Sequence, residues 1–295
     1  MTAVTAVTAP RRLALCADDF GLAPAISAGI ARLAHAGRLN AISCLTNGRH
    51  WTRDAPLLNG MAAEVDIGLH LNFTEGRPLS AALARHWPSL PSLPALIARA
   101  HLGALPHAAL RAEVQAQLEA FVRVRGVAPA FVDGHQHVHH LPMLRGVVLE
   151  LIDSVQPRPA VRSTGRVRGP GADLKRWLIE RTGGRALARA LARRGVAHNA
   201  ALLGAYDFID PDYRALMQGW LAAVPAEGGL LFCHPGDAAE GQHGIHRDSG
   251  SNNAPDAPDV IAPARLREAA YLGSAAFIDD LGAANVSLGR VWRVP

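Results

Sequence analysis

Four short motifs place acidic or histidine side chains where an apolar run of the sequence ends. They are ADDFG at 17–21, GLHLN at 68–72, VDGHQHVHH at 132–140 and LLFCHPG at 230–236. Carboxylates and imidazoles are ligands for divalent metals, and they also act as general bases and acids. The chemistry to be tested is therefore metal-assisted or acid–base catalysis at a shared site.

The first motif contains two adjacent aspartates, Asp18 and Asp19. Each is costly to bury without a cation or hydrogen-bond donors. Because side chains alternate faces along a strand, both can reach one site only where the strand breaks into a loop, and Gly21 permits such a break. In isolation, the more common interpretation is that Asp18 caps a turn and Asp19 is solvated.

Two other motifs each end an apolar run on one histidine. His70 lies between two leucines, with Asn72 expected on the same face, and His234 precedes a Pro-Gly turn that directs the chain outward. A lone histidine of this kind is more often a hydrogen-bonded residue of the core than a ligand. Both gain functional weight only if other motifs converge on them.

The histidine-rich motif at 132–140 looks like a metal-binding cluster, but strand geometry indicates that most of its histidines do not bind a metal. In an extended strand one side would carry Asp133, His135, His137 and His139. Same-side neighbours are then about 7 Å apart, whereas a zinc–nitrogen bond is about 2.0–2.1 Å, so these histidines do not all bind one ion. We expect one ligand with neighbours that orient it or touch substrate, with structural hydrogen bonding as the alternative, and His140 facing elsewhere.

The elements that must position these residues alternate between short apolar runs and amphipathic helical stretches. Eight candidate strands are 13–17, 41–47, 65–72, 130–135, 159–163, 201–205, 229–234 and 286–291. Most are followed by a helix, which predicts an α/β fold: a distorted, TIM-barrel-like (β/α) barrel forming a single domain over 13–295, after a loose leader at 1–12. Loop insertions are expected at 73–108, 163–198 and 235–262.

In such a barrel, catalytic residues gather where strands end, because the following loops meet at one mouth. The expected constellation is Asp18, Asp19, His70, His135 and His234. Two histidines and one carboxylate make a three-ligand metal site with open positions for water, and the bound metal lowers the pKa of that water to about 7. The second carboxylate and the remaining histidine are then free to act as base and acid.

Together the four ordered motifs resemble the YdjC-like family of carbohydrate deacetylases, which includes chitooligosaccharide and hopanoid-associated deacetylases. The resemblance implies a distorted β/α barrel that uses one divalent ion, magnesium or zinc, to remove an N-acetyl group from an amino-sugar oligosaccharide or glycolipid. It further implies that Asp19, His70 and His135 bind the metal, that Asp18 is the base and that His234 is the acid. Asn72, Asp133, His137 and His139 are kept as substrate-binding or ligand-supporting candidates.

Three alternatives stay open: another barrel metallohydrolase of the amidohydrolase type, with paired His-x-His ligands; a non-catalytic carbohydrate-binding protein; and an arginine-driven binder of nucleic acid or anionic lipid. The first normally has its His-x-His on the first strand, where this chain has Asp-Asp. The second has no need of a base and an acid beside a metal.

Composition bears on the binding partners and the cellular compartment expected for the protein. The 295 residues include 30 basic ones, and they thicken in RSTGRVRG (162–169) and the helical stretch at 175–194 without interleaved aromatics, which favours a solvated face over nucleic-acid binding. Three separated cysteines within apolar runs predict buried residues in a reduced compartment. Because the sequence has no long apolar segment, we expect a cytoplasmic protein without a transmembrane segment. A homodimer is one expected oligomeric state.

Overall fold

The computed structural model describes residues 9–238 and 259–294. Its centre is an eight-stranded sheet in the order β5-β4-β3-β2-β1-β7-β6, with β8 paired to β1, and all strand pairs are parallel. The strands are β1 Arg11–Phe20, β2 Ala41–Cys44, β3 Asp66–Leu71, β4 Phe131–Gly134, β5 Ala160–Val161, β6 Leu202–Leu203, β7 Gly229–Cys233 and β8 Val286–Leu288. Each of the eight predicted runs contains or overlaps one strand.

The two ends of this sheet approach each other. Isolated parallel bridges join Val161 to His198 and Val167 to Leu202, so β5 and β6 are linked through the intervening chain rather than by a regular ladder. The predicted α/β fold with a distorted barrel is confirmed. The proposed leader at 1–12 stays a prediction, because residues 1–8 lie outside the described part of the chain.

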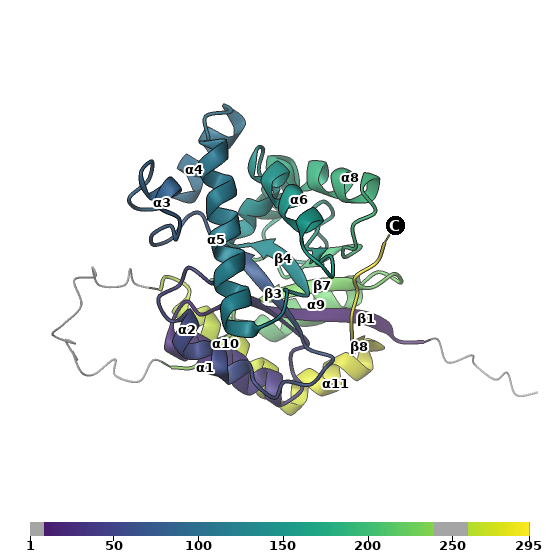
Figure 1. Ribbon diagram of the computed structural model, residues 1–295. Coiled ribbons are helices and arrows are strands. Elements are labelled where there is room, and N and C mark those ends of the chain that lie inside the picture. The colour runs from purple at the N-terminus through teal and green to yellow at the C-terminus, as the bar shows by residue number, and fades with distance from the viewer. Residues whose placement is uncertain (1–8, 239–258, 295) are drawn as a thin grey trace, which may run out of the picture.

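Helices cover the outside of the sheet. The helices are α1 Pro24–His35, α2 Trp51–Asp54, α3 Ala81–Ala84, α4 Leu93–His101, α5 His107–Arg125, α6 Leu144–Ser154, α7 Asp173–Ile179, α8 Arg185–Arg193, α9 Tyr213–Ala223, α10 Ala262–Gly273 and α11 Ala275–Ala283. In Figure 1, α1, α10 and α11 lie on one side of the strands and α6 and α8 on the other, while α5 runs past the strands between them. None of the described helices is long and apolar enough to cross a membrane.

The expected insertions hold local structure of their own. The segment 73–108 contains α3 and α4, and 163–198 contains α7 and α8, joined by a π-helical turn at Glu180–Gly184. Most of the third insertion lies outside the described residues.

Strand alternation sorts the core into two parts. Along β1, Leu13, Leu15 and Ala17 belong to the large cluster shared with the surrounding helices. Ala14 and Cys16, with side chains such as Phe131 and Phe232 of other strands, form a second, smaller cluster. The three cysteines are buried and free, as the sequence predicts, in β1, β2 and β7.

In five of the strands, the residue two positions after the last member of the smaller cluster is polar, and it lies on the same face. They are Asp18 after Cys16, Ser43 after Ala41, Asp133 after Phe131, Arg162 after Ala160 and His234 after Phe232, with His70 level with Asp133 on β3. Because alternate residues share a face, these six side chains continue the layers of the smaller cluster at the carboxyl end of the sheet. The period of the strands thus places the candidate residues at one mouth.

Candidate metal centre

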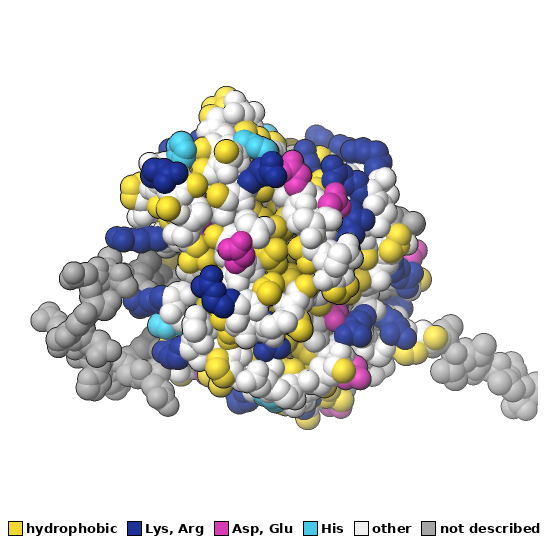
Figure 2. Space-filling view, viewed as in Figure 1, with side chains coloured by type: hydrophobic (Ala, Val, Ile, Leu, Met, Phe, Trp, Pro, Cys, Tyr) yellow, Lys and Arg dark blue, Asp and Glu magenta, His cyan; other side chains and the backbone are white. Residues whose placement is uncertain are grey.

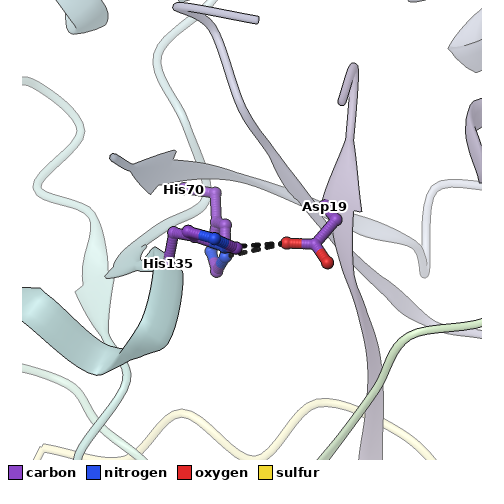
Figure 3. A group of neighbouring side chains, drawn as sticks. All are labelled: Asp19, His70 and His135. Carbon is purple, nitrogen blue, oxygen red and sulfur yellow. Dashed lines mark hydrogen bonds and ion pairs between the residues drawn. The ribbon is translucent and has the colours of Figure 1, made fainter. Parts of the chain in front are cut away.

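Asp19, His70 and His135 bring their side chains together at this end of the barrel. A ligand atom from each lies within 4.8 Å of the others, and all three residues are buried. Asp19 Oδ1 is 2.9 Å from His135 Nδ1 and 3.6 Å from His70 Nε2. Figure 3 shows both imidazole rings directed at the same carboxylate.

The break in β1 happens at the second aspartate itself. Asp19 has φ 72°, in the left-handed region, and Gly21 follows with φ 93°. The pairing of β1 with β2 shifts between Ala17 and Phe20. Because of this bulge, Asp18 stays on the interior face of the strand, and the side chain of Asp19, one residue further on, also points inward to the histidines. Both aspartates are buried.

Asp133 orients His70 rather than its near neighbour His135. Its Oδ1 accepts hydrogen bonds from His70 Nδ1 at 2.7 Å and from the Ser43 hydroxyl at 2.5 Å. A carboxylate on Nδ1 fixes the ring and leaves Nε2 unprotonated toward Asp19, which is the arrangement that metal-binding histidines usually have.

Arg162 differs from what its sequence context predicts. Although it opens the basic stretch expected to be a solvated face, it is fully buried. Its guanidinium donates to Asp18 Oδ2 at 2.7 Å and Oδ1 at 2.5 Å, and it lies 2.5 Å from Asp133 Oδ2. Cys16, Asp18 and Asp133 also converge closely enough to hold an ion, but this guanidinium already supplies the cation there.

The helix α10 contributes two further residues that no sequence motif indicated. Arg265 donates to Asp19 Oδ2 at 2.8 Å and to the His234 carbonyl oxygen at 3.3 Å. Three residues on, Glu268 accepts from the His234 backbone N–H at 2.5 Å and from the Tyr206 hydroxyl at 2.5 Å. One helix therefore holds the backbone of His234 from both sides and ties it to Asp19.

Charge balance in this region favours a cation. Three buried carboxylates, Asp18, Asp19 and Asp133, face two buried guanidinium groups, Arg162 and Arg265. Burial opposes protonation of His135, yet the carboxylates of Asp19 and Glu75 raise its pKa to about 10. A position that holds a proton this firmly has the negative potential and the donor atoms that a divalent ion requires, so the residues fit such an ion.

His135 also contacts a carboxylate outside the predicted set. Its Nε2 is 3.1 Å from Glu75 Oε1 but is not aligned for a hydrogen bond. Asn72 accounts for the position of Glu75, because its Oδ1 accepts from the backbone N–H groups of Thr74 and Glu75. Asn72 thus shapes the loop after β3 and makes no described contact with His70.

The strand geometry assumed for the histidine-rich motif was wrong beyond Gly134. Residues His135–His140 form a tight helical turn in which Gln136 and His137 have φ 52° and 61°. His139 Nε2 bonds the Arg162 carbonyl oxygen at 2.9 Å, and His140 bonds Thr164 and Thr182. His139 therefore has the kind of structural hydrogen bond that the sequence left as the alternative, and His140 is held by two threonine hydroxyls.

The remaining two histidines face the aromatic side of the mouth. His137 packs edge-on against Phe232, and its buried Nδ1 has no hydrogen-bond partner among the described residues. The ring of His234 lies edge-on between Phe208 and Phe232, at centroid distances of 5.1 and 5.6 Å. Burial, together with the charges of nearby basic side chains, lowers the pKa of His234, so its resting imidazole is neutral.

A parallel α/β barrel with Asp and His side chains gathered at the carboxyl ends of its strands has the layout that barrel enzymes share. Comparison with known proteins identifies the family. Residues 12–283 match the family model described as YdjC-like protein, and the chain belongs to this family.

Named relatives are similar over part of their length. Carbohydrate deacetylase of Mus musculus is 36% identical over 168 residues, which cover 52% of this chain and 52% of that protein. Chitooligosaccharide deacetylase of Escherichia fergusonii is 30% identical over 47% of this chain and 54% of that protein. The chain spans about half the length of the curated relatives it matches.

A solved structure supports the fold alone. The crystal structure of a protein from Enterococcus faecalis V583, described as a candidate for cellobiose-phosphate cleavage, has a TM-score of 0.67 and 19% identity. The match covers 96% of this chain and 98% of that one, so the architecture is shared over nearly its full extent.

Proposed function

We propose that this protein is a metal-dependent carbohydrate deacetylase that hydrolyses the N-acetyl group of an amino sugar and releases acetate. The observation that supports it most is the convergence of Asp19, His70 and His135, with the buried Asp18 and the half-buried His234 at the same end of the barrel. The names of the relatives favour an amide of a sugar as the substrate.

Asp19, His70 and His135 are proposed to hold one divalent ion, magnesium or zinc, since a carboxylate and two imidazoles suit either. A bound ion of this kind polarises a carbonyl group and lowers the pKa of water. Asp133 keeps His70 in the tautomer that can bind, through its 2.7 Å contact with Nδ1. Arg265 holds the second oxygen of Asp19 and leaves Oδ1 for the histidines.

Asp18 is proposed as the base that removes a proton from the attacking water. Arg162 holds both of its oxygens, so the carboxylate cannot rotate and its free lone pairs keep one direction. Rigid orientation of this kind is what efficient proton transfer requires.

His234 is proposed to protonate the departing amine. Since its resting imidazole is neutral, it must take up a proton during the reaction, and the proton that Asp18 removes is a balanced source. Arg265 and Glu268 fix the backbone of His234, and the two phenylalanine rings fix its imidazole.

The competing amidohydrolase-type site is less well supported. It needs paired His-x-His ligands, yet His137 lies against Phe232 and outside the group formed by His135, His70 and Asp19. A binding protein without catalysis would not need a carboxylate held in one orientation next to Asp19, as Asp18 is by Arg162.

The test is metal content and acetate release in the same preparations. We expect wild-type protein to bind about one divalent ion per chain and to release acetate from one or more members of a panel that includes chitooligosaccharides and an N-acetylglucosaminyl lipid. His70→Ala should lose the metal, Asp18→Asn should keep the metal but lose activity, and His86→Ala, at an exposed position, should match wild type. Metal retained by His70→Ala, or undiminished acetate release by Asp18→Asn, contradicts the assigned roles.

A further inference from the structure

The helix α7 exposes an apolar face. Leu174, Trp177 and Leu178 are 69%, 53% and 43% exposed, and Ile209 on the neighbouring loop is 78% exposed. Positions i, i+3 and i+4 share one side of a helix, so the three residues of α7 point the same way. We call Leu174, Trp177 and Leu178 the α7 face; Ile209 follows the loop that contacts Lys175 of the same helix. Contiguous exposed apolar groups of this kind mark interaction surfaces in soluble domains.

The inward side of the same helix connects the α7 face to the candidate site. Lys175 donates to the Tyr206 carbonyl oxygen at 2.9 Å, and its ammonium lies 4.1 Å from the centre of the Phe208 ring. Phe208 in turn packs against His234. Its backbone has φ 69°, a strained conformation for a bulky residue, and strain of this sort concentrates at functional sites. The α7 face therefore borders the mouth of the barrel.

The chain segment that contains α7 is strongly basic. Residues 162–194 hold ten of the chain's 30 basic side chains and only two of its 25 acidic ones. Within the described part of the chain, the arginines of this segment that pair with no carboxylate are Arg166, Arg168, Arg181, Arg189 and Arg193. Arg181 lies over the ring of Trp177 at 5.7 Å. Figure 2 shows Lys and Arg side chains gathered over α8.

We propose that the α7 face docks onto the surface of an anionic lipid bilayer. Tryptophan and leucine side chains insert at the boundary between headgroups and acyl chains, while unpaired arginines bind lipid phosphates. A second copy of the chain is a poorer partner, because it would bring two basic faces together. A nucleic acid would use the arginines but not exposed Leu174, Leu178 and Ile209.

Docking through the α7 face would bring the mouth of the barrel close to the membrane, because α7 packs on the loop that contacts His234. The consequence for catalysis rests on the proposed deacetylase function: an N-acetylated sugar carried by a lipid would meet the site without leaving the bilayer. The docking itself does not depend on that function, because it is measured without turnover.

The experiment is co-sedimentation of the full chain with vesicles of phosphatidylcholine, alone or mixed with phosphatidylglycerol. We expect binding to the mixed vesicles, weakening as sodium chloride rises, and a blue shift of tryptophan fluorescence that Trp177→Ser abolishes. Leu174→Ser with Trp177→Ser should raise the lipid concentration for half-maximal binding by about tenfold or more. Leu102→Ser, at a residue 82% exposed after α4, is the matched apolar control and should bind as wild type.

Charge is tested separately by Arg166→Gln with Arg181→Gln, against Arg123→Gln on the exposed side of α5. The first pair should weaken binding to the mixed vesicles and the control should not. Absence of wild-type binding, or equal binding by the Leu174/Trp177 variant, overturns the proposal. So does a wild-type dimer that this variant converts to a monomer, since the α7 face would then be an interface between copies. Acetate release from a water-soluble sugar should be unchanged in all these variants, which separates failure of docking from failure of the proposed function.

Discussion

Glu268 is a buried acid whose ionisation opposes folding. Burial raises its pKa to about 7 from an ordinary value of 4.5, against the two hydrogen bonds from His234 and Tyr206 that favour the charged form. Each tenfold change in a proton affinity corresponds to about 1.4 kcal/mol, so this difference corresponds to about 3 kcal/mol. Between these two pH values the unfolded chain has lost the proton and the folded chain keeps it, so stability falls as pH rises through that range and is level above it.

Glu268→Gln removes the titration and keeps both a hydrogen-bond acceptor and the shape of the side chain. We expect the variant and wild type to have similar free energies of unfolding near pH 4.5, and the variant to be more stable by as much as about 3 kcal/mol at pH 8. Urea unfolding of both proteins across this range measures the difference, in which the titrating groups that do not interact with Glu268 cancel. A difference that does not change with pH, or a variant less stable than wild type at pH 8, refutes the reasoning.

Three further variants test the candidate site. Asp133→Asn should lower metal affinity about 10- to 100-fold in a metal titration, because His70 loses the carboxylate that fixes its ring; unchanged affinity would contradict this. Arg162→Lys should keep the metal but lower acetate release and cost about 2 kcal/mol or more in urea unfolding, since one ammonium cannot meet two carboxylates as the guanidinium does. His137→Phe should keep wild-type metal content by elemental analysis, and loss of the metal would revive a His-x-His site.

The fold was predictable because the same sequence pattern, a short apolar run followed by a helix, occurs repeatedly along the chain. Each short apolar run is buried on both faces in a parallel sheet, and each is separated from the next by turn residues and a helix, so eight independent runs gave one answer. The same period of two predicts where Asp18, His70 and His234 stand, since each continues the interior face of its strand.

Residues outside the motifs were not predictable for a physical reason. Arg162 and Arg265 are arginines in a chain with many exposed arginines, and composition carries no sign of which guanidinium is buried. Their burial follows from carboxylates that lie far away in sequence, Asp18 and Asp19, which only the closed barrel brings within reach. The search for such partners has to begin from the buried negative charges and not from the basic stretches.

The histidine-rich motif shows the limit of arguing from strand period. Alternation holds to Gly134, where a Cβ would lie 2.9 Å from the His139 backbone nitrogen, so the chain turns back tightly on itself. Gln136 and His137 then adopt left-handed conformations that the sequence does not signal with glycine or asparagine. Because the turn reverses direction within a few residues, His135 faces Asp19 while His139 reaches the Arg162 carbonyl. The histidines of this motif therefore have two separate roles. His135 contributes to the candidate metal site, and His139 and His140 form hydrogen bonds that hold the segment carrying Arg162.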